Sequence, residues 1–335
     1  MSSKSEDEKI IKKWREIFEL PKKEMRKELK QLDLSLVTSE NQNILHIACK
    51  DTKKDSIEIL LSINDTKKEK EKEKNLDINL QDKTKGWTPL YYLLDSSDGS
   101  ETDILQMLIK SGTKINISDK YGITPLHLIS FKGQDEYMSI FLQNNVDINV
   151  QDKFKRIPLN YAIMEGQLNS AYFLLEAGSI INSKDIDGNS LLHYAVSSKG
   201  NSLLFSIMLI DRKINLNEIN NDGDTALMLI AKKNPKENVR LIKKLIDSGA
   251  KYKNIINYKC QSFLSLMGEA ALRDKFYEDK NINIKQENEN AMKKMEKYLQ
   301  NNYGKNFDIK SCFFTVIVPF FILCIAFTIN SMNFL

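Results

Sequence analysis

The stretch Gly122-Ile123-Thr124-Pro125-Leu126-His127 decides the fold, because related stretches recur along the chain. Gly86-Trp87-Thr88-Pro89-Leu90 is a second copy, and Ser190-Leu191-Leu192-His193 is a weaker one. Aspartates recur at a constant interval of 33 residues, at Asp119, Asp152 and Asp185. A fixed period of this length indicates a solenoid in which each repeat contributes one small supersecondary unit.

The residue types within each copy favour a helix that starts at the Thr-Pro pair. The hydroxyls of Thr88 and Thr124 can accept hydrogen bonds from the free N–H groups of the first turn. Pro89 and Pro125 then hold the first helical position, where no N–H is needed. A second helix ends at a slot that favours a left-handed residue, held in turn by Gly112, Asn145, Gly178, Lys213 and Gly249. Lys213 is poorly suited to this conformation, so we expect an irregular turn there.

These motifs closely resemble those of the ankyrin family, whose repeat is a β-turn finger followed by two antiparallel helices. The resemblance implies an all-α ankyrin-repeat solenoid of about six to seven repeats, to which the last part of the sequence adds a transmembrane helix. We expect five segments: capping helices in residues 1–37, the ankyrin-repeat domain in residues 38–284, a polar linker in residues 285–310, a transmembrane helix in residues 311–330 and a short tail in residues 331–335.

Residues 9–31 carry apolar side chains at helical spacing, interrupted by Pro21. This pattern predicts two helices, and a solenoid must cover the apolar face of its first repeat. A cap packed on the first repeat is therefore our preferred interpretation. The alternative is a basic amphipathic helix lying on anionic lipid, because lysines and arginines surround the apolar stripe. Glutamates between these basic residues weaken that alternative.

Residues 311–335 contain no charged side chain, and Cys312–Ile329 is an almost continuous apolar run. As a helix the run would span roughly 27 Å, close to the thickness of a bilayer core. Lysines precede it and no basic residue follows it. We therefore expect a single-pass protein, similar to tail-anchored proteins, with membrane lipid around residues 311–330 and its repeats in the cytosol. The sequence does not indicate which membrane. Cys312, at the cytosolic edge, is a candidate lipidation site.

Composition and motifs argue against several function classes. Lys and Arg number 49 against 45 Asp and Glu, a net charge of +4 without the clustered excess of a nucleic-acid-binding protein. The polar N-terminus predicts no secretory signal peptide, and four scattered cysteines predict reduced thiols. We recognise no motif for catalysis, a cofactor or a metal, so we predict neither an enzyme nor a cofactor.

The resemblance also assigns roles to individual residues. His46, His127 and His193 fall at the histidine of the ankyrin phrase, which bonds to neighbouring backbone, so we interpret all three as structural. Ankyrin arrays bind proteins through finger tips and the adjacent inner helices. Three central fingers are basic and aromatic, which favours an acidic partner segment with an apolar anchor, contacted by Lys85, Trp87, Lys120, Tyr121, Phe154 and Arg156. The next two fingers are acidic, with Asp187, Asp222 and Asp224.

Two alternatives stay open at this point. Trp87, Tyr121 and Phe154 could serve only to pack finger on finger. At the level of the whole chain, a membrane-anchored interaction scaffold competes with a shortened front part of an ankyrin-containing DHHC palmitoyltransferase or of an ankyrin-bearing channel. Residues 313–321 look similar to the first membrane helix of those palmitoyltransferases, but the sequence has no Asp-His-His-Cys motif.

Overall fold

The computed structural model describes residues 2–67, 75–233, 238–252, 255–259 and 261–267. The chain forms two compact units, residues 1–221 and residues 222–335. The linker expected in residues 285–310, the membrane helix expected in residues 311–330 with Cys312, and the tail expected after it lie outside the described residues. Among the helices that are described, none is both long and apolar enough to cross a bilayer.

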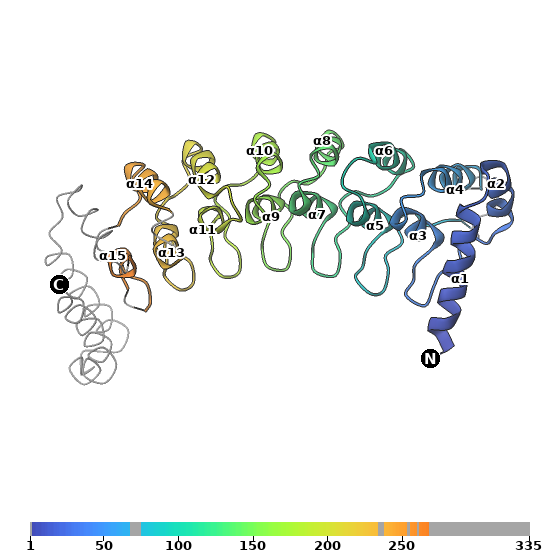
Figure 1. Ribbon diagram of the computed structural model, residues 1–335, viewed down its shortest axis with the longest axis horizontal. Coiled ribbons are helices and arrows are strands. Elements are labelled where there is room, and N and C mark those ends of the chain that lie inside the picture. The colour runs from blue at the N-terminus through green and yellow to red at the C-terminus, as the bar shows by residue number, and fades with distance from the viewer. Residues whose placement is uncertain (1, 68–74, 234–237, 253–254, 260, 268–335) are drawn as a thin grey trace, which may run out of the picture. The chain divides into compact units, whose positions relative to one another are not determined.

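The first unit contains a row of helix pairs (Figure 1). In each pair, an inner helix follows a long loop, here called a finger, and an outer helix packs behind it. The inner helices are α3 (Ile44–Lys50), α5 (Pro89–Ser96), α7 (Pro125–Lys132), α9 (Pro158–Met164) and α11 (Leu191–Ser197). The outer helices are α4 (Lys54–Lys67), α6 (Thr102–Lys110), α8 (Asp135–Gln143), α10 (Leu168–Glu176) and α12 (Ser202–Asp211).

The repeated phrase supplies both the start of each inner helix and its core residue. Helices α5, α7 and α9 all begin at the proline of the phrase. The leucine that follows is at most 1% exposed at Leu90, Leu126 and Leu159. Burying a leucine side chain stabilises a fold by about 1.5–3 kcal/mol. The same short motif therefore fixes where the helix begins and which face of it meets the core.

The threonine cap predicted from the phrase is wrong at Thr88. Its hydroxyl makes no capping bond and, within the described residues, is buried without a partner. The hydroxyl of Thr124 lies 2.8 Å from Nδ1 of His127, three residues further on. Tyr91 takes the place of this histidine after Thr88, and its hydroxyl points away to donate to Ile117 O at 2.9 Å. The hydroxyl of Thr88 thus lacks the side-chain partner that the hydroxyl of Thr124 has.

The turn after α12 is regular, contrary to the expectation from Lys213. Lys213 adopts φ of 60°, in the left-handed region that Gly178 also occupies at 91°. Its N–H donates to Ile210 O at 2.8 Å, and the following N–H donates to Leu209 O at 3.2 Å. These helix-closing hydrogen bonds hold a lysine in a conformation that costs an ordinary residue roughly 1–2 kcal/mol.

Helices α1 (Ser2–Phe18) and α2 (Lys22–Gln31) lie on either side of Pro21 and cover the first pair of the row. Helix α1 contacts α3, and α2 contacts α4. The apolar stripe faces protein, with Trp14, Met25 and Leu29 at most 2% exposed. Such a buried stripe is not available to lie on lipid.

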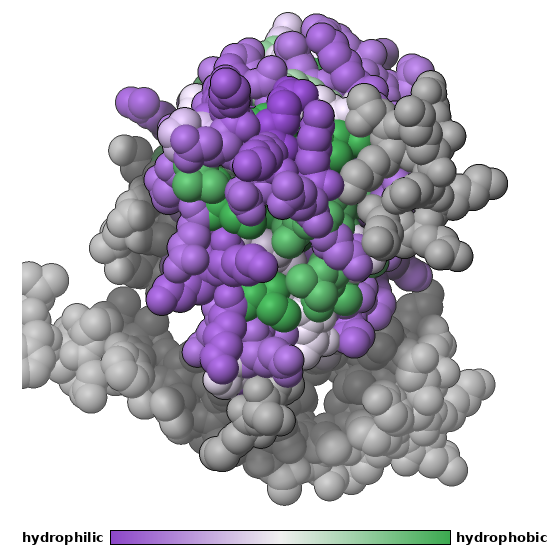
Figure 2. All heavy atoms as spheres, turned by 90° about the vertical axis from the view of Figure 1, so that its right-hand side faces the viewer, coloured by the Kyte–Doolittle hydropathy of each residue, from purple (hydrophilic) through white to green (hydrophobic). Residues whose placement is uncertain are grey.

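Ion pairs add to this packing of the cap. Three join it to the first repeat: Arg15–Asp51, Lys53–Glu19 and Lys22–Asp55, each with a nitrogen–oxygen distance of 2.7 Å. Figure 2 looks at this end of the unit and shows mostly hydrophilic side chains with smaller hydrophobic areas between them.

The second unit is described from its start to residue 267, with gaps. It contains α13 (Ala226–Lys233), α14 (Val239–Asp247) and α15 (Phe263–Leu266), and α13 contacts both of the others. The N–H of Tyr258 donates to Asp222 O at 3.0 Å, and the amide of Asn257 donates to Asp224 Oδ1 at 2.7 Å. One backbone and one side-chain hydrogen bond therefore join the two loops of this unit.

Candidate protein-interaction surface

Each finger is built around an aspartate that closes the loop on itself. The N–H of Asp152 donates to Arg156 O at 2.9 Å, across the base of the finger. Its Oδ1 accepts hydrogen bonds at 2.8 Å from the N–H groups of Phe154 and Arg156. Asp82, Asp119 and Asp185 make the same kind of closure. The aspartates that recur at 33 residues in the sequence are therefore loop-forming residues.

Neighbouring fingers are joined by single backbone hydrogen bonds. The N–H of Lys120 donates to Lys85 O at 3.0 Å, and the N–H of Lys153 donates to Tyr121 O at 2.9 Å. The same link continues from Ile186 to Phe154 O at 3.1 Å. These bonds fix the tips relative to one another, so a partner would meet side chains on a frame that is already ordered.

Tyrosines of the inner helices support three of these aspartates. Tyr92 donates to Asp82 Oδ2 at 2.7 Å, Tyr161 donates to Asp152 Oδ2 at 2.6 Å, and Tyr194 donates to Asp185 Oδ2. Burial raises the pKa of all three tyrosines, and the bonded carboxylates raise it further. Burial opposes ionisation of Asp82, but hydrogen bonds from Tyr92 and three backbone N–H groups outweigh it and lower the pKa of this carboxyl. The finger bases are therefore anchored to the inner helices by charge-assisted hydrogen bonds.

The three histidines occupy equivalent buried positions in α3, α7 and α11. Nδ1 of His127 accepts the N–H of Thr124 at 3.1 Å, so Nε2 carries the proton and donates to Arg156 O at 3.1 Å. His46 accepts the N–H of Asn43 in the same way, and His193 accepts that of Ser190. Burial lowers the pKa of His46 to about 4 and also lowers that of His127. His46 and His127 thus link a helix start to the next finger as neutral imidazoles.

Trp87 is half-buried and packs within the fold. Its ring stacks on Tyr91 at 5.7 Å between centroids and meets Tyr92 edge-on at 5.5 Å. Its indole Nε1 donates to Asp119 of the next finger at 3.4 Å, and Lys85 Nζ lies 3.6 Å from the ring centroid. These contacts hold Trp87 against the inner helix of its own repeat and against the next finger, as in the packing alternative left open by the sequence.

Tyr121 and Phe154 differ from Trp87 because they project from the tips of the next two fingers. Tyr121 is 60% exposed and Phe154 is 42% exposed. The neighbouring Lys120 is exposed as well. The structure therefore separates the three aromatic residues that the sequence grouped together.

Arg156 is held between two aromatic rings and a buried carboxylate. Its guanidinium lies 4.5 Å from the centroid of Phe154 and 4.8 Å from that of Tyr161. Nε and the terminal nitrogen both bond to Asp152 Oδ2 at 3.0 Å. Phe131, at the end of α7, is 43% exposed, and its ring lies 6.5 Å from that of Tyr161. Phe131, Phe154, Arg156 and Tyr161 form what we call the aromatic cluster.

Comparisons with known proteins agree with this architecture. A family model of ankyrin repeats that spans three copies matches residues 20–119 and again residues 94–185. These residues are ankyrin repeats. The helices within residues 20–185 accordingly form an ankyrin-repeat solenoid. Ankyrin repeats are protein-interaction modules, so the comparison also implies protein partners.

A solved structure shows the same fold. The crystal structure of the ankyrin repeat domain of Bcl-3, described as a unique member of the IkappaB protein family, is similar with a TM-score of 0.57 at 20% sequence identity. The match covers 69% of this chain and 96% of that one. At this identity the similarity concerns the fold alone. No curated protein matches the chain in sequence.

Along the ankyrin fingers, exposed lysines outnumber exposed acids. Five lysines, here called the basic ridge, are exposed and form no ion pair within the described residues: Lys83, Lys85, Lys120, Lys153 and Lys155. The aspartates of the same fingers are engaged in closing the loops, and Asp82 and Asp152 are at most 5% exposed. These three fingers are therefore basic, and the third carries Phe154 and Arg156 of the aromatic cluster. The described residues contain no group of three side chains placed to hold a metal ion.

Sequence reasoning did not single out Phe131 or Tyr161. Two spacings were present as signals. Phe131 follows His127 by four residues and so shares a helix face with it. Tyr161 is nine residues after Asp152, the same spacing that separates Tyr194 from Asp185. These spacings indicate which side chains share a face, but not that Phe131 and Arg156 both lie against Tyr161.

Proposed function

We propose that this protein is an interaction scaffold that binds a partner through the basic ridge and the aromatic cluster. The observation that carries the proposal is the exposed ring of Phe154 against the fixed guanidinium of Arg156, with the exposed Phe131 beside Tyr161. Exposed aromatic side chains gain large buried area at low entropic cost, and Arg156 is already ordered by Asp152. Such residues are typical centres of binding energy in protein interfaces.

Charge indicates the chemistry of the partner. The lysines of the basic ridge have no acidic partner within the described residues, so an acidic segment would gain ion pairs without breaking any. Individual exposed pairs add little affinity, but together they accelerate association and exclude basic competitors. The partner segment we propose is acidic and carries one apolar anchor that packs on the exposed rings of the aromatic cluster.

The test is a triple variant, Tyr121→Ala, Phe131→Ala and Phe154→Ala, compared with Tyr172→Ala. Tyr172 is a matched control, since it is 51% exposed on the outer helix α10. Trp87 is left intact because it packs within the fold. The triple variant should melt within a few degrees of the wild type and lose at least tenfold in affinity for the partners recovered by pull-down. Capture of the same partners with unchanged affinity would refute the proposed surface.

We also propose that residues 311–330 anchor the scaffold in a membrane with the ankyrin repeats in the cytosol. The support is the sequence alone: an apolar run without charges, preceded by Lys293, Lys294, Lys297, Lys305 and Lys310. Protease added to intact microsomes should remove the repeats, and alkaline carbonate should not extract the chain. Protection of the repeats would reverse the orientation, and extraction would exclude the membrane span.

The competing proposal is a shortened front part of an ankyrin-containing DHHC palmitoyltransferase or of a channel. It rests on the similarity of residues 313–321 to the first membrane helix of those enzymes. Coding sequence for further membrane helices downstream of Leu335 would favour it over the scaffold. Without such sequence, the scaffold is the better account.

A further inference from the structure

Asparagine side chains bridge successive repeats at the loops that lead into the fingers. Asn79 Oδ1 accepts the N–H of Lys114 in the next loop at 2.7 Å. Asn116 accepts the N–H of Asp147 at 3.2 Å, and Asn149 accepts that of Ile180 at 2.9 Å. Each bridge satisfies a backbone N–H and joins two successive loops. Such a bond contributes a modest but regular stabilisation.

The next bridge in the series is missing. Asn182 occupies the position of Asn149, and Asn215 occupies the position of Ile180, two residues after the left-handed Lys213. Within the described residues, neither the side chain of Asn182 nor the N–H of Asn215 has a hydrogen-bond partner. The side chain of Asn215 turns to its own loop, accepting the N–H of Asn217 at 3.1 Å and donating to Glu218 at 2.6 Å.

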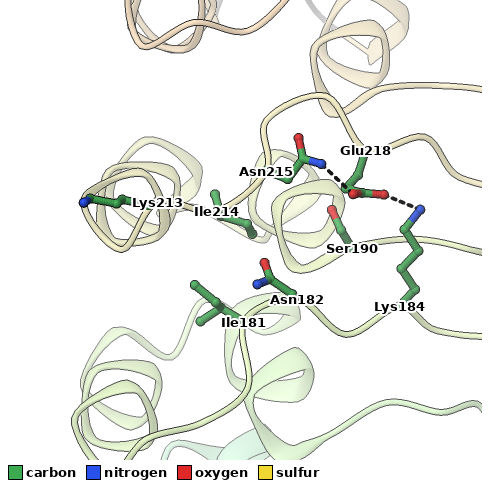
Figure 3. A pocket seen from close by; sticks show the side chains of 8 residues that line it. All are labelled: Ile181, Asn182, Lys184, Ser190, Lys213, Ile214, Asn215 and Glu218. Atoms are coloured by element: carbon green, nitrogen blue, oxygen red, sulfur yellow. Dashed lines mark hydrogen bonds and ion pairs between the residues drawn. The ribbon is translucent and has the colours of Figure 1, made fainter.

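A pocket of about 350 Å³ lies where this bridge is missing, at the lower end of the size range of ligand sites. Figure 3 shows its side chains, with Asn182 and Asn215 on opposite sides and the aliphatic chains of Ile181 and Ile214 beside them. The remaining lining residues are Lys184, Ser190, Lys213 and Glu218.

Two of the three charged residues that line the pocket, Lys184 and Glu218, form an ion pair, which argues against a free anion or cation as its ligand. Lys184 Nζ lies 2.5 Å from Glu218, and this hydrogen bond lowers the pKa of the Glu218 carboxyl. The ammonium of Lys213 points away from the other lining residues (Figure 3). The groups that remain to contact a ligand are the N–H of Asn215, the side-chain amide of Asn182 and the aliphatic side chains of Ile181 and Ile214. A peptide group next to an apolar side chain matches all three.

We propose that this pocket binds an extended peptide segment of a protein partner. Its main-chain carbonyl accepts the N–H of Asn215, in the place that Asn182 would fill, and its main-chain N–H donates to Asn182 Oδ1. Its apolar side chain lies on Ile181 and Ile214. This site is separate from the basic ridge and aromatic cluster, and it stands whether or not that surface binds a partner.

The probe is N-acetyl-leucine N-methylamide, titrated into the detergent-solubilised, ¹⁵N-labelled full chain and followed by NMR. The N–H of Asn215 should shift saturably at millimolar probe, whereas the bridged N–H groups of Lys114, Asp147 and Ile180 should not. The glycine analogue, which lacks the apolar side chain, should bind at least threefold more weakly. Sodium acetate should produce no saturable shift. No saturable shift at Asn215, an equal shift at Ile180, or an equal response to acetate would overturn the proposal.

A pair of variants separates binding from stability. Asn182→Ala should leave the melting temperature within one degree of the wild type, because it breaks no bridge, and should weaken probe binding at least threefold. Asn149→Ala should lower the melting temperature, because it removes a bridge, and should leave probe binding unchanged. If Asn182→Ala melts as low as Asn149→Ala, the bridge forms in solution and the pocket is closed, which refutes the proposal.

Discussion

At the residue scale, equivalent positions in different repeats carry different side chains, so the effect of each side chain on the free energy of unfolding can be compared. The slot after the outer helix is left-handed whether Gly178 or Lys213 occupies it. The histidine slot links two repeats through both of its ring nitrogens at His127. Because the backbone is the same at each position, substitutions there isolate one physical effect at a time.

Lys213→Gly should stabilise the protein by about 1 kcal/mol. The substitution removes the strain of a left-handed lysine, and the greater flexibility of glycine in the unfolded chain offsets part of the gain. The reciprocal control is Gly178→Ala, whose added methyl would meet no atom within 4 Å. That variant should destabilise by a similar amount through strain alone. Urea denaturation measures both, and a lower midpoint for Lys213→Gly would contradict the argument.

His127→Ala should destabilise by roughly 1–3 kcal/mol, because it leaves the N–H of Thr124 without a partner in a buried site and removes one of the two hydrogen bonds to the carbonyl of Arg156. Arg156 belongs to the aromatic cluster, so some loss of partner binding can accompany the loss of stability. A loss of partner binding with an unchanged urea midpoint would instead place His127 on the contact surface.

At the scale of elements, the capping helices are held by both apolar burial and ion pairs, and these two contributions differ in size. The three ion pairs of the cap are largely exposed, and exposed pairs typically contribute 0–1 kcal/mol each. Trp14 is 1% exposed and belongs to the large side chains that are fully buried. Burial of the apolar stripe therefore dominates.

Trp14→Ala should cost about 3–5 kcal/mol, the range for removing a large aromatic side chain from a core. Arg15→Ala, one residue away, should cost less than about 1 kcal/mol despite its two bonds to Asp51. Thermal unfolding followed by circular dichroism compares the two. Equal losses would mean that the ion pair, and not the buried ring, fixes the cap.

At the scale of the whole molecule, buried titratable groups couple the fold to pH. The pKa of His46 is lowered by burial to about 4, so the unfolded chain binds a proton below about pH 6.5 that the folded chain does not. Stability should therefore fall as pH drops from about 6.5 to about 4, by up to about 3 kcal/mol from this residue. The pKa of Asp82 is lower in the folded chain than in the unfolded chain. Its carboxylate therefore stabilises the fold at pH values above the unfolded pKa, and this contribution is lost as pH falls through the folded pKa.

Acid should therefore destabilise the protein through both groups, first through His46 between about pH 6.5 and pH 4 and then through Asp82 as its carboxyl is protonated. Urea denaturation midpoints measured between pH 7.5 and pH 4 test the first window. His46→Gln should flatten the slope between pH 6.5 and pH 4 while lowering stability at pH 7. An unchanged slope in that variant would mean that His46 does not supply the acid sensitivity.

The sequence by itself determined the repeat, the helix starts and the core, since these depend on motifs only a few residues long. The Thr-Pro-Leu-His phrase places a proline at a helix start and a buried leucine after it, whatever the neighbouring repeats contain. The left-handed slots and the aspartate of each finger follow from the same local chemistry, because their hydrogen bonds join residues within five positions.

Tertiary structure alone decided which of the repeated side chains face solvent. Trp87 turns inward because Tyr91, Tyr92 and Asp119 offer it stacking and a hydrogen bond, whereas Tyr121 and Phe154 remain exposed at their tips. The aromatic cluster and the missing bridge between Asn182 and Asn215 likewise depend on side chains about 30 residues apart. Such pairs are set by how each repeat stacks on the next, and a single repeat's sequence does not contain that information.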